Sequence, residues 1–189
     1  AIVSNCIFLI ICQSMNEVEI YQTIAKRGTV EECEQHGPIF CTDNPWLGAG
    51  YYFWDGLLSN AEWWGKTHYH NDYMIFKSSY DVHSELLLDL VGNVKHIEYF
   101  QRYAHGLKVV LGRKTIKVST MIEFMKKAGN FPFQAIRVEG RNIRGSKNVM
   151  LVFDDQGMYY LQPVPKIQLC ITDFDSFHIA DYKFVKASE

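Results

Sequence analysis

The sequence has no Cys-x-x-C pair, no excess of one charge and no long apolar segment, and each absence excludes a class of protein. Its five cysteines are scattered and odd in number, which argues against a disulfide framework and a zinc knuckle. With 19 basic and 21 acidic residues, the formal net charge of −2 supplies no positive field for nonspecific nucleic-acid binding. We therefore expect a cytoplasmic protein in a reducing compartment, without a stable nucleic-acid partner.

The apolar run at residues 6–12 is far shorter than the roughly 20 residues that a membrane-spanning helix needs. No basic stretch precedes it and no small-x-small cleavage pattern follows it, so it lacks the marks of a secretory signal. A buried strand is expected here, and no membrane partner. The alternative is that residues 1–14 are a non-native extension and that the natural protein starts at Met15.

What is present is the composition of a folded globular protein, with 48% apolar and 14% aromatic residues. A length of 189 residues suits one core better than two small ones. We find no repeat, low-complexity tract or linker. The sequence predicts a single domain over residues 1–189.

Ser/Thr-x-x-Glu capping boxes predict where helices start, because the hydroxyl and the carboxylate can both bond free amides of the first turn. Such boxes begin at Thr29, Ser59 and Thr120. We predict helices over about 30–36, with Gly37 as a left-handed stop, over about 59–68, and from Thr120 to a terminator at Gly129.

Runs rich in β-branched and aromatic residues predict strands at 18–24, 51–54, 73–76, 135–138, 149–153, 158–161, 167–171 and 178–185. The turn-forming residues 154–157 indicate a hairpin between two of these runs, whereas residues 84–91 suit a helix turn as well as a strand. Strands outnumber helices without regular β-α-β alternation. We therefore predict an α+β domain built on antiparallel sheets, rather than a Rossmann fold.

The most informative segment is residues 48–55, Gly-Ala-Gly-Tyr-Tyr-Phe-Trp-Asp. Gly48 and Gly50 allow a tight turn and let the backbone approach a ligand, because no Cβ stands in the way. Strand alternation places Tyr52 and Trp54 on one face and the two other aromatic residues on the opposite face. Either this is an aromatic core strand behind a glycine turn, or one of its faces meets the ring of a ligand.

This block resembles the second motif of the ADP-ribosyltransferases, Gly-x-Gly-x-Tyr-Phe-x-Asp followed by a helix with a Ser-Ala pair. The resemblance is to the poly(ADP-ribose) polymerase branch and its small bacterial relatives. The matching residues are Gly48, Gly50, Tyr52, Phe53 and Asp55, with Asn60-Ala61 at the Ser-Ala position. The family implies an ADP-ribosyltransferase-like fold of split antiparallel β-sheets around a NAD cleft. It also implies that Tyr52 stacks on the nicotinamide, where cation–π attraction would add to stacking, and that Asn60 frames the pocket.

The first family motif is a strand ending in His-Gly-Thr or His-Gly-Ser, whose polar groups bind the adenosine ribose and the nicotinamide amide. The early strand at residues 18–24 lies about thirty residues before Tyr52, as the family order requires. Gln22 thus stands in for the histidine, since an amide can donate to a ribose hydroxyl, and Thr23 lies beside it. The alternative is that both are ordinary outward-facing strand residues.

The third family motif is a strand, Asn-Glu-Tyr-Ile-Val-Tyr-Asp, whose glutamate binds the nicotinamide ribose and stabilises the transition state. The matching run is residues 148–154, in which Asn148 would line the pocket and Val149 takes the glutamate position. Valine offsets no positive charge, and losing such stabilisation can cost on the order of a hundredfold in rate.

Three explanations of Val149 stay open. The acid comes from Glu139, Asp154 or Glu62; or the alignment is shifted and Gln156 or Gln162 takes the role; or the protein binds NAD or ADP-ribose without efficient transfer.

Other patterns have simpler explanations. The pair His68 and His70 is more typical of a solvent-facing segment than of a metal site, and Cys33 with His36 forms one helix face, so no metal is expected. Core packing is expected for most of the tryptophans Trp46, Trp63 and Trp64. The basic residues that either contact a pyrophosphate or form a solvated loop are Arg137, Arg141, Arg144 and Lys147.

The sequence therefore predicts a mono-ADP-ribosyltransferase that uses NAD as substrate and an unknown macromolecular acceptor. Catalytic roles are expected for Tyr52 and Gln22. The residues expected to bind NAD are Thr23, Gly48, Gly50, Asn60 and Asn148. The alternatives are a catalytically impaired NAD-binding or interaction module and a purely structural domain. By the resemblance, bacterial relatives of this kind act as toxins or effectors delivered to another cell.

Overall fold

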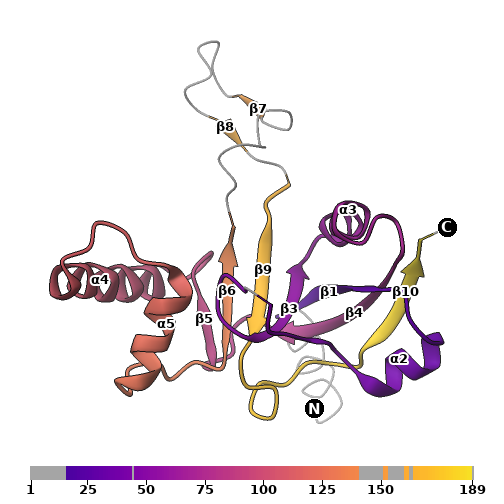
Figure 1. Cartoon of the computed structure of the whole chain (residues 1–189), viewed down its shortest axis with the longest axis horizontal. Helices are drawn as coiled ribbons and strands as arrows, with labels where there is room; N and C mark the ends of the chain where they lie inside the picture. Colours follow the sequence, from indigo (N-terminus) through magenta and orange to yellow (C-terminus); the bar gives the residue numbers. More distant parts are fainter. Residues whose placement is uncertain (1–15, 44, 141–150, 153–159, 162–163, 189) are drawn as a thin grey trace, which may run out of the picture.

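The computed structural model describes residues 16–43, 45–140, 151–152, 160–161 and 164–188 (Figure 1). The helices of this part are α2 (Val30–His36), α3 (Leu58–His68), α4 (Val94–Leu111) and α5 (Val118–Lys127). The strands are β1 (Glu17–Ala25), β2 (Phe40–Cys41), β3 (Gly50–Asp55), β4 (Tyr73–Asp81), β5 (Leu87–Asp89), β6 (Ala135–Glu139), β7 (Leu151–Val152), β8 (Tyr160–Leu161), β9 (Ile167–Ile171) and β10 (Lys183–Ala187). The predicted α+β class is confirmed.

The main sheet is one open path in the order β10-β4-β1-β3-β9-β6-β5, and β2 pairs with β3. Its neighbours are antiparallel except for the parallel pair β5 and β6. The prediction of purely antiparallel sheets is therefore wrong at this pair. Parallel neighbours need a crossover connection, and here α4 and α5 supply it.

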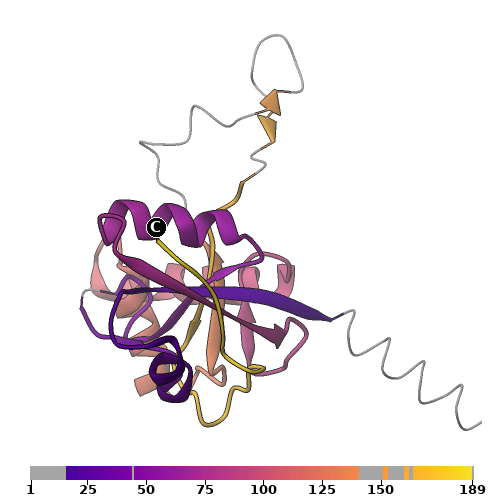
Figure 2. The same cartoon turned by 90° about the vertical axis from the view of Figure 1, so that its right-hand side faces the viewer.

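Helices cover both faces of the sheet, with α2 on one side and α3 on the other (Figures 1 and 2). The α2 side holds the largest core cluster, in which Phe53 packs against strands from both halves of the sheet. The opposite side holds a cluster with Trp54 beneath α3 and another with Tyr52 that reaches Ile122 of α5. The predicted alternation of the aromatic residues along β3 is thus confirmed.

The helix starts agree with only one of the predicted capping boxes. The Thr29 hydroxyl accepts from the Glu32 amide at 3.2 Å and the Glu32 carboxylate accepts from the Thr29 amide at 2.9 Å. Gly37 follows α2 with φ 76° and ψ −166°, a positive φ outside the left-handed helical region. The boxes at Ser59 and Thr120 are wrong, because α3 and α5 begin earlier and both residues lie inside a first turn.

Helix α4 was not expected from the sequence. It begins at an Asn93 side chain that accepts from two amides of the first turn and ends at Gly112 in the left-handed conformation. Its inner face packs on α5 through Leu107, Met121 and Met125. The two helices lie at the β5 end of the sheet, away from α2 and β10 (Figure 1).

Several strand limits also differ from the sequence prediction. The ambiguous residues 84–91 contain strand β5, β4 continues to Asp81, and only the end of the run 178–185 is strand. The predicted hairpin pairing is confirmed where it is described, since β7 and β8 pair antiparallel in a separate sheet. In the described part of the chain, no helix is long and apolar enough to cross a membrane.

Candidate functional site

Tyr52 lies at the middle of β3, which runs between β1 and β9. Its backbone pairs with Cys170 of β9, its hydroxyl donates to the Gly48 carbonyl at 2.8 Å, and the Leu47 amide donates to that hydroxyl at 3.1 Å. Burial, together with nearby Cys170, raises the pKa of Tyr52 well above its ordinary value. The side chain is therefore a neutral phenol whose hydroxyl is held by its own loop.

Gly48 and Gly50 are each required by the structure, for different reasons. Gly48 has φ 103°, a backbone conformation that side-chain-bearing residues rarely adopt. A Cβ on Gly50 would lie 2.7 Å from both the Cys170 sulfur and the Ile171 carbonyl oxygen. The close approach of β9 is enough to require glycine at position 50, and its predicted role beside NAD stays a prediction.

Gln22 does lie next to Tyr52, but its amide is fully occupied inside the protein. Its Nε2 donates to the Ile39 carbonyl at 3.1 Å and to the Tyr52 carbonyl at 3.2 Å. Its Oε1 accepts from the Ile39 amide at 2.7 Å and from the Tyr182 hydroxyl at 3.0 Å. An amide group has two N–H donors and two acceptor lone pairs, so nothing remains for a ribose hydroxyl unless one of these bonds breaks.

Thr23 and Asn60 also bond to the main chain. The Thr23 hydroxyl donates to the Ala61 carbonyl at 2.8 Å, which joins β1 to the first turn of α3. The Asn60 amide donates to the Pro165 carbonyl at 2.9 Å, which joins α3 to the segment before β9. Both side chains are buried. The predicted role of Asn60 beside NAD stays a prediction, whereas Asn148 and Val149 lie outside the described residues.

The strand beside β3 is β9, and not the run 148–154 that was matched to the third family motif. Of that run, Leu151–Val152 forms β7 and pairs only with β8 in the described part of the chain. The sequence could not show this, because the pairing of β3 with β9 joins residues more than a hundred positions apart.

Two residues at the start of β9 were missed by the sequence reasoning. The Lys166 ammonium lies 3.0 Å from the centre of the Trp63 ring, and burial lowers the pKa of this lysine. The Gln168 side chain accepts from the Trp46 indole N–H at 2.8 Å. Trp46 and Trp63 are each 40% exposed, so the expectation of tryptophans in the core is wrong for these two. The contacts of Trp46 with Gln168 and of Trp63 with Lys166 would have identified these residues, but such contacts form only in the folded protein and leave no pattern in the sequence.

The acids proposed as substitutes for the glutamate differ in their surroundings. Glu62 forms an ion pair with Lys186 at 2.9 Å. Glu139, at the end of β6, stands opposite Ile167 in the register of β6 and β9 and therefore lies one residue away from Lys166. Asp154, Gln156 and Gln162 lie outside the described residues.

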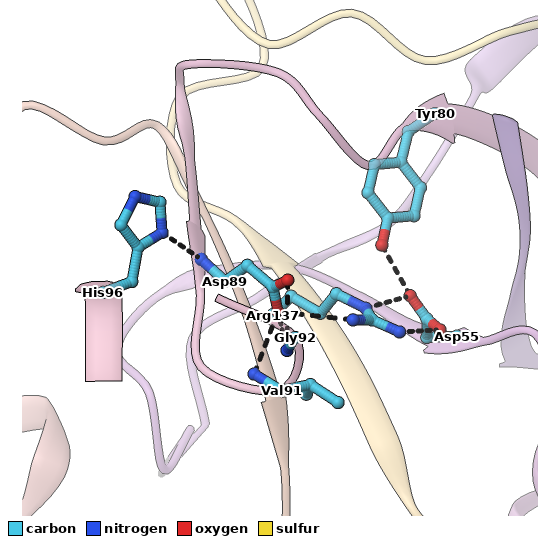
Figure 3. Close-up of polar contacts among 7 residues, drawn as sticks. All are labelled: Asp55, Tyr80, Asp89, Val91, Gly92, His96 and Arg137. Atoms are coloured by element: carbon cyan, nitrogen blue, oxygen red, sulfur yellow. Dashed lines mark hydrogen bonds and ion pairs between the residues drawn. The ribbon is translucent and has the colours of Figure 1, made fainter. Parts of the chain in front are cut away.

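A second polar group occupies the opposite face of β3, at its far end (Figure 3). Arg137 donates to both carboxylate oxygens of Asp55, at 3.1 and 3.3 Å, and to Asp89 at 3.3 Å. The Tyr80 hydroxyl donates to Asp55 at 2.6 Å. Burial favours loss of the proton from Arg137, but the hydrogen bond and charge of Asp55 outweigh it and raise the guanidinium pKa. Arg137 therefore joins β3 to β5 through two carboxylates, and its expected contact with a pyrophosphate stays a prediction. Arg141, Arg144 and Lys147 lie outside the described residues.

Beside this cluster the surface forms an open cleft of about 690 Å³ between the β4–β5 connection and the start of α4. Arg137 and Asp89 line its floor, and His96 lines its wall. The His96 Nδ1 accepts from the Asp89 amide at 3.1 Å, so this ring is also engaged in holding the turn before α4. Tyr52 is not among the residues that line this cleft.

Comparison of the chain with protein-family profiles, with curated proteins and with solved structures finds no match in any of the three.

Proposed function

We propose that this chain is an ADP-ribosyltransferase-like protein that binds NAD or ADP-ribose on the face of β3 and β9 beside α3. The observation that carries the proposal is the environment of Tyr52. The half-buried ring is held at its hydroxyl, and Trp46 and Trp63, both 40% exposed, contact the start of the adjacent strand β9. Flat aromatic surface of this kind suits the rings of a dinucleotide.

The side chains near Tyr52 favour binding of NAD or ADP-ribose without efficient transfer of ADP-ribose. The polar side chains on this face at the start of β9 are Lys166, just before the strand, and Gln168, and neither is a carboxylate that could offset an oxocarbenium-like charge. A lysine ammonium also repels a cationic nicotinamide and attracts a pyrophosphate. We therefore expect ADP-ribose to bind at least as tightly as NAD.

The test is calorimetric titration of the folded protein with NAD and with ADP-ribose. Tyr52→Ala and Trp63→Ala should each weaken binding about tenfold or more, because each removes stacking area. Phe40→Ala is the matched control, since Phe40 is 46% exposed and packs on Tyr51, on the other face of β3. No heat with either ligand in the millimolar range would refute the proposal.

Transfer stays the second candidate, and Glu139 is the described acid that pairs with the start of β9, although strand alternation places it on the Arg137 face of the sheet, opposite Tyr52. Incubation with labelled NAD tests it through the release of free nicotinamide. Release that disappears in Glu139→Gln and in Tyr52→Ala would identify a transferase. Binding without release above background would leave the binding module as the function.

A further inference from the structure

The α4–α5 pair carries a concentration of positive charge that the net charge of the protein hides. Between Glu98 and Glu123 the chain has five basic residues and no acidic one, while the remainder has 14 basic and 21 acidic residues. The basic residues are Arg102, Lys108, Arg113, Lys114 and Lys117, and all five are exposed. None of them forms an ion pair with a carboxylate among the described residues.

Exposed aliphatic side chains lie among these charges. Val109 is 69% exposed, Val110 is 81% exposed and Leu111 is 37% exposed, at the C-terminal end of α4. Leu111 also lines a shallow groove of about 520 Å³ together with Arg113, Ile116 and Lys117. Four of the five cations and these aliphatic groups therefore lie within ten consecutive residues, 108–117, which we call the α4 tip.

The α4 tip projects from the body of the protein. Helix α4 starts beside β5, where His96 bonds the Asp89 amide, and its 18 residues then extend about 27 Å along the helix axis. Beyond its first turns, α4 packs on α5 and on Ile116 and Phe131, which flank α5. In Figure 1 the two helices form a lobe at one end of the molecule.

From this combination we propose that the α4 tip docks on a membrane surface rich in anionic phospholipid. Lysine and arginine side chains are attracted to such a surface, and aliphatic groups beside them can enter the headgroup region. A projecting tip suits a deformable bilayer, whereas two exposed valines gain nothing from nucleic-acid phosphates. This is surface association and needs no spanning helix. It does not depend on the proposed NAD site.

Vesicle co-sedimentation of the full chain tests the proposal. Vesicles with phosphatidylserine in phosphatidylcholine should retain the protein, pure phosphatidylcholine should not, and raised salt should release it. Arg113→Glu with Lys114→Glu should lower the bound-to-free ratio about tenfold or more. Val109→Ser with Val110→Ser should lower it about fivefold.

The matched control is Lys26→Glu with Lys183→Glu, the same charge change at exposed positions on the β1–β4 and β10 side. It should leave most vesicle binding intact. Equal retention on neutral and anionic vesicles, or equal loss in the control and the α4-tip variants, would overturn the proposal. So would binding of duplex DNA through Arg113 and Lys114 without vesicle binding. Circular dichroism of each variant verifies that it is folded.

Discussion

The two ends of strand β3 hold polar groups in opposite ways. Near Tyr52 the groups are neutral, and Gln22, Thr23 and Asn60 bond mainly to the main chain. At Asp55 the groups are charged, and Arg137 forms ion pairs with two carboxylates from different parts of the sheet (Figure 3). The charged groups join strands, whereas the neutral groups hold loops and helix α3 to the sheet, with Gln22 on the face opposite the Tyr52 ring.

These two groups of residues differ in how much free energy the protein would lose if a ligand bound beside them. Breaking up Asp55, Asp89 and Arg137 would leave a buried charge unpaired, which is strongly unfavourable. A ring placed against Tyr52 need disturb no hydrogen bond, because the hydroxyl and the neighbouring amides are already satisfied. The charged end is therefore expected to govern stability, and the neutral end to govern binding.

The largest effect should follow from Arg137→Met, which leaves Asp55 and Asp89 without their cation. We expect the free energy of unfolding to fall by about 3–5 kcal/mol, measured by urea denaturation. Lys77→Met is the control, because Lys77 and Glu19 are 48% and 54% exposed and such pairs contribute less than about 1 kcal/mol. An equal fall in the free energy of unfolding in the two variants would show that the ion pairs of Arg137 do not stabilise the sheet more than an exposed pair does.

A smaller effect is expected for Gln22→Leu, which removes four hydrogen bonds and leaves the Ile39 amide unsatisfied. The free energy of unfolding should fall by about 2–3 kcal/mol, against about 1 kcal/mol for Thr23→Val, which loses one bond. Gln22→Leu could instead abolish NAD or ADP-ribose binding and leave the free energy of unfolding unchanged. That result would show that the Gln22 amide binds the ligand and does not act only within the protein.

The smallest effect concerns Cys170, which pairs with Tyr52 in the sheet. Burial raises the pKa of this thiol from 9.0 to about 12, so the folded state keeps the proton that the unfolded state releases. Its stabilising contribution is complete below pH 9 and is lost as pH rises toward 12, by about 1 kcal/mol per pH unit. Unfolding of the wild type and of Cys170→Val at pH 8 and near pH 10 checks this. A variant with the same pH dependence as the wild type would exclude Cys170 as the cause.

Local signals in the sequence were sufficient for some elements. Thr29 and Glu32 lie three positions apart, so their capping box can be read directly, and the alternation around Tyr52 follows from strand geometry. The same kind of signal was wrong at Ser59 and Thr120, where packing of α3 and α5 extends each helix beyond the box. In α4, Gly106 and the neighbouring valines Val109 and Val110 weaken helix propensity, although Asn93 and Gly112 were usable end signals.

The strand that carries Tyr52 could be predicted from the sequence, but the neighbours of that strand could not. The motif around Tyr52 identified the strand, and Gln22 does contact it. One of the two donors to the side-chain oxygen of Gln22 is Tyr182, 160 residues later, and the strand that pairs with Tyr52 is β9. Such long-range pairs leave no local pattern, which is why Lys166 and Gln168 were missed and residues 148–154 were matched instead.

The sheet order has a consequence for how the chain folds. Strand β1 precedes the other described strands in sequence, yet Tyr182 supplies the last hydrogen bond of its Gln22, and among the described strands it is β10 that covers the outer edge of β4. Pairings so distant in sequence make folding slow, and an uncovered strand edge can pair with another chain in the meantime. Until β10 has emerged during synthesis, the outer edge of β4 is therefore an unpaired strand edge, and aggregation of the growing chain is expected to start there.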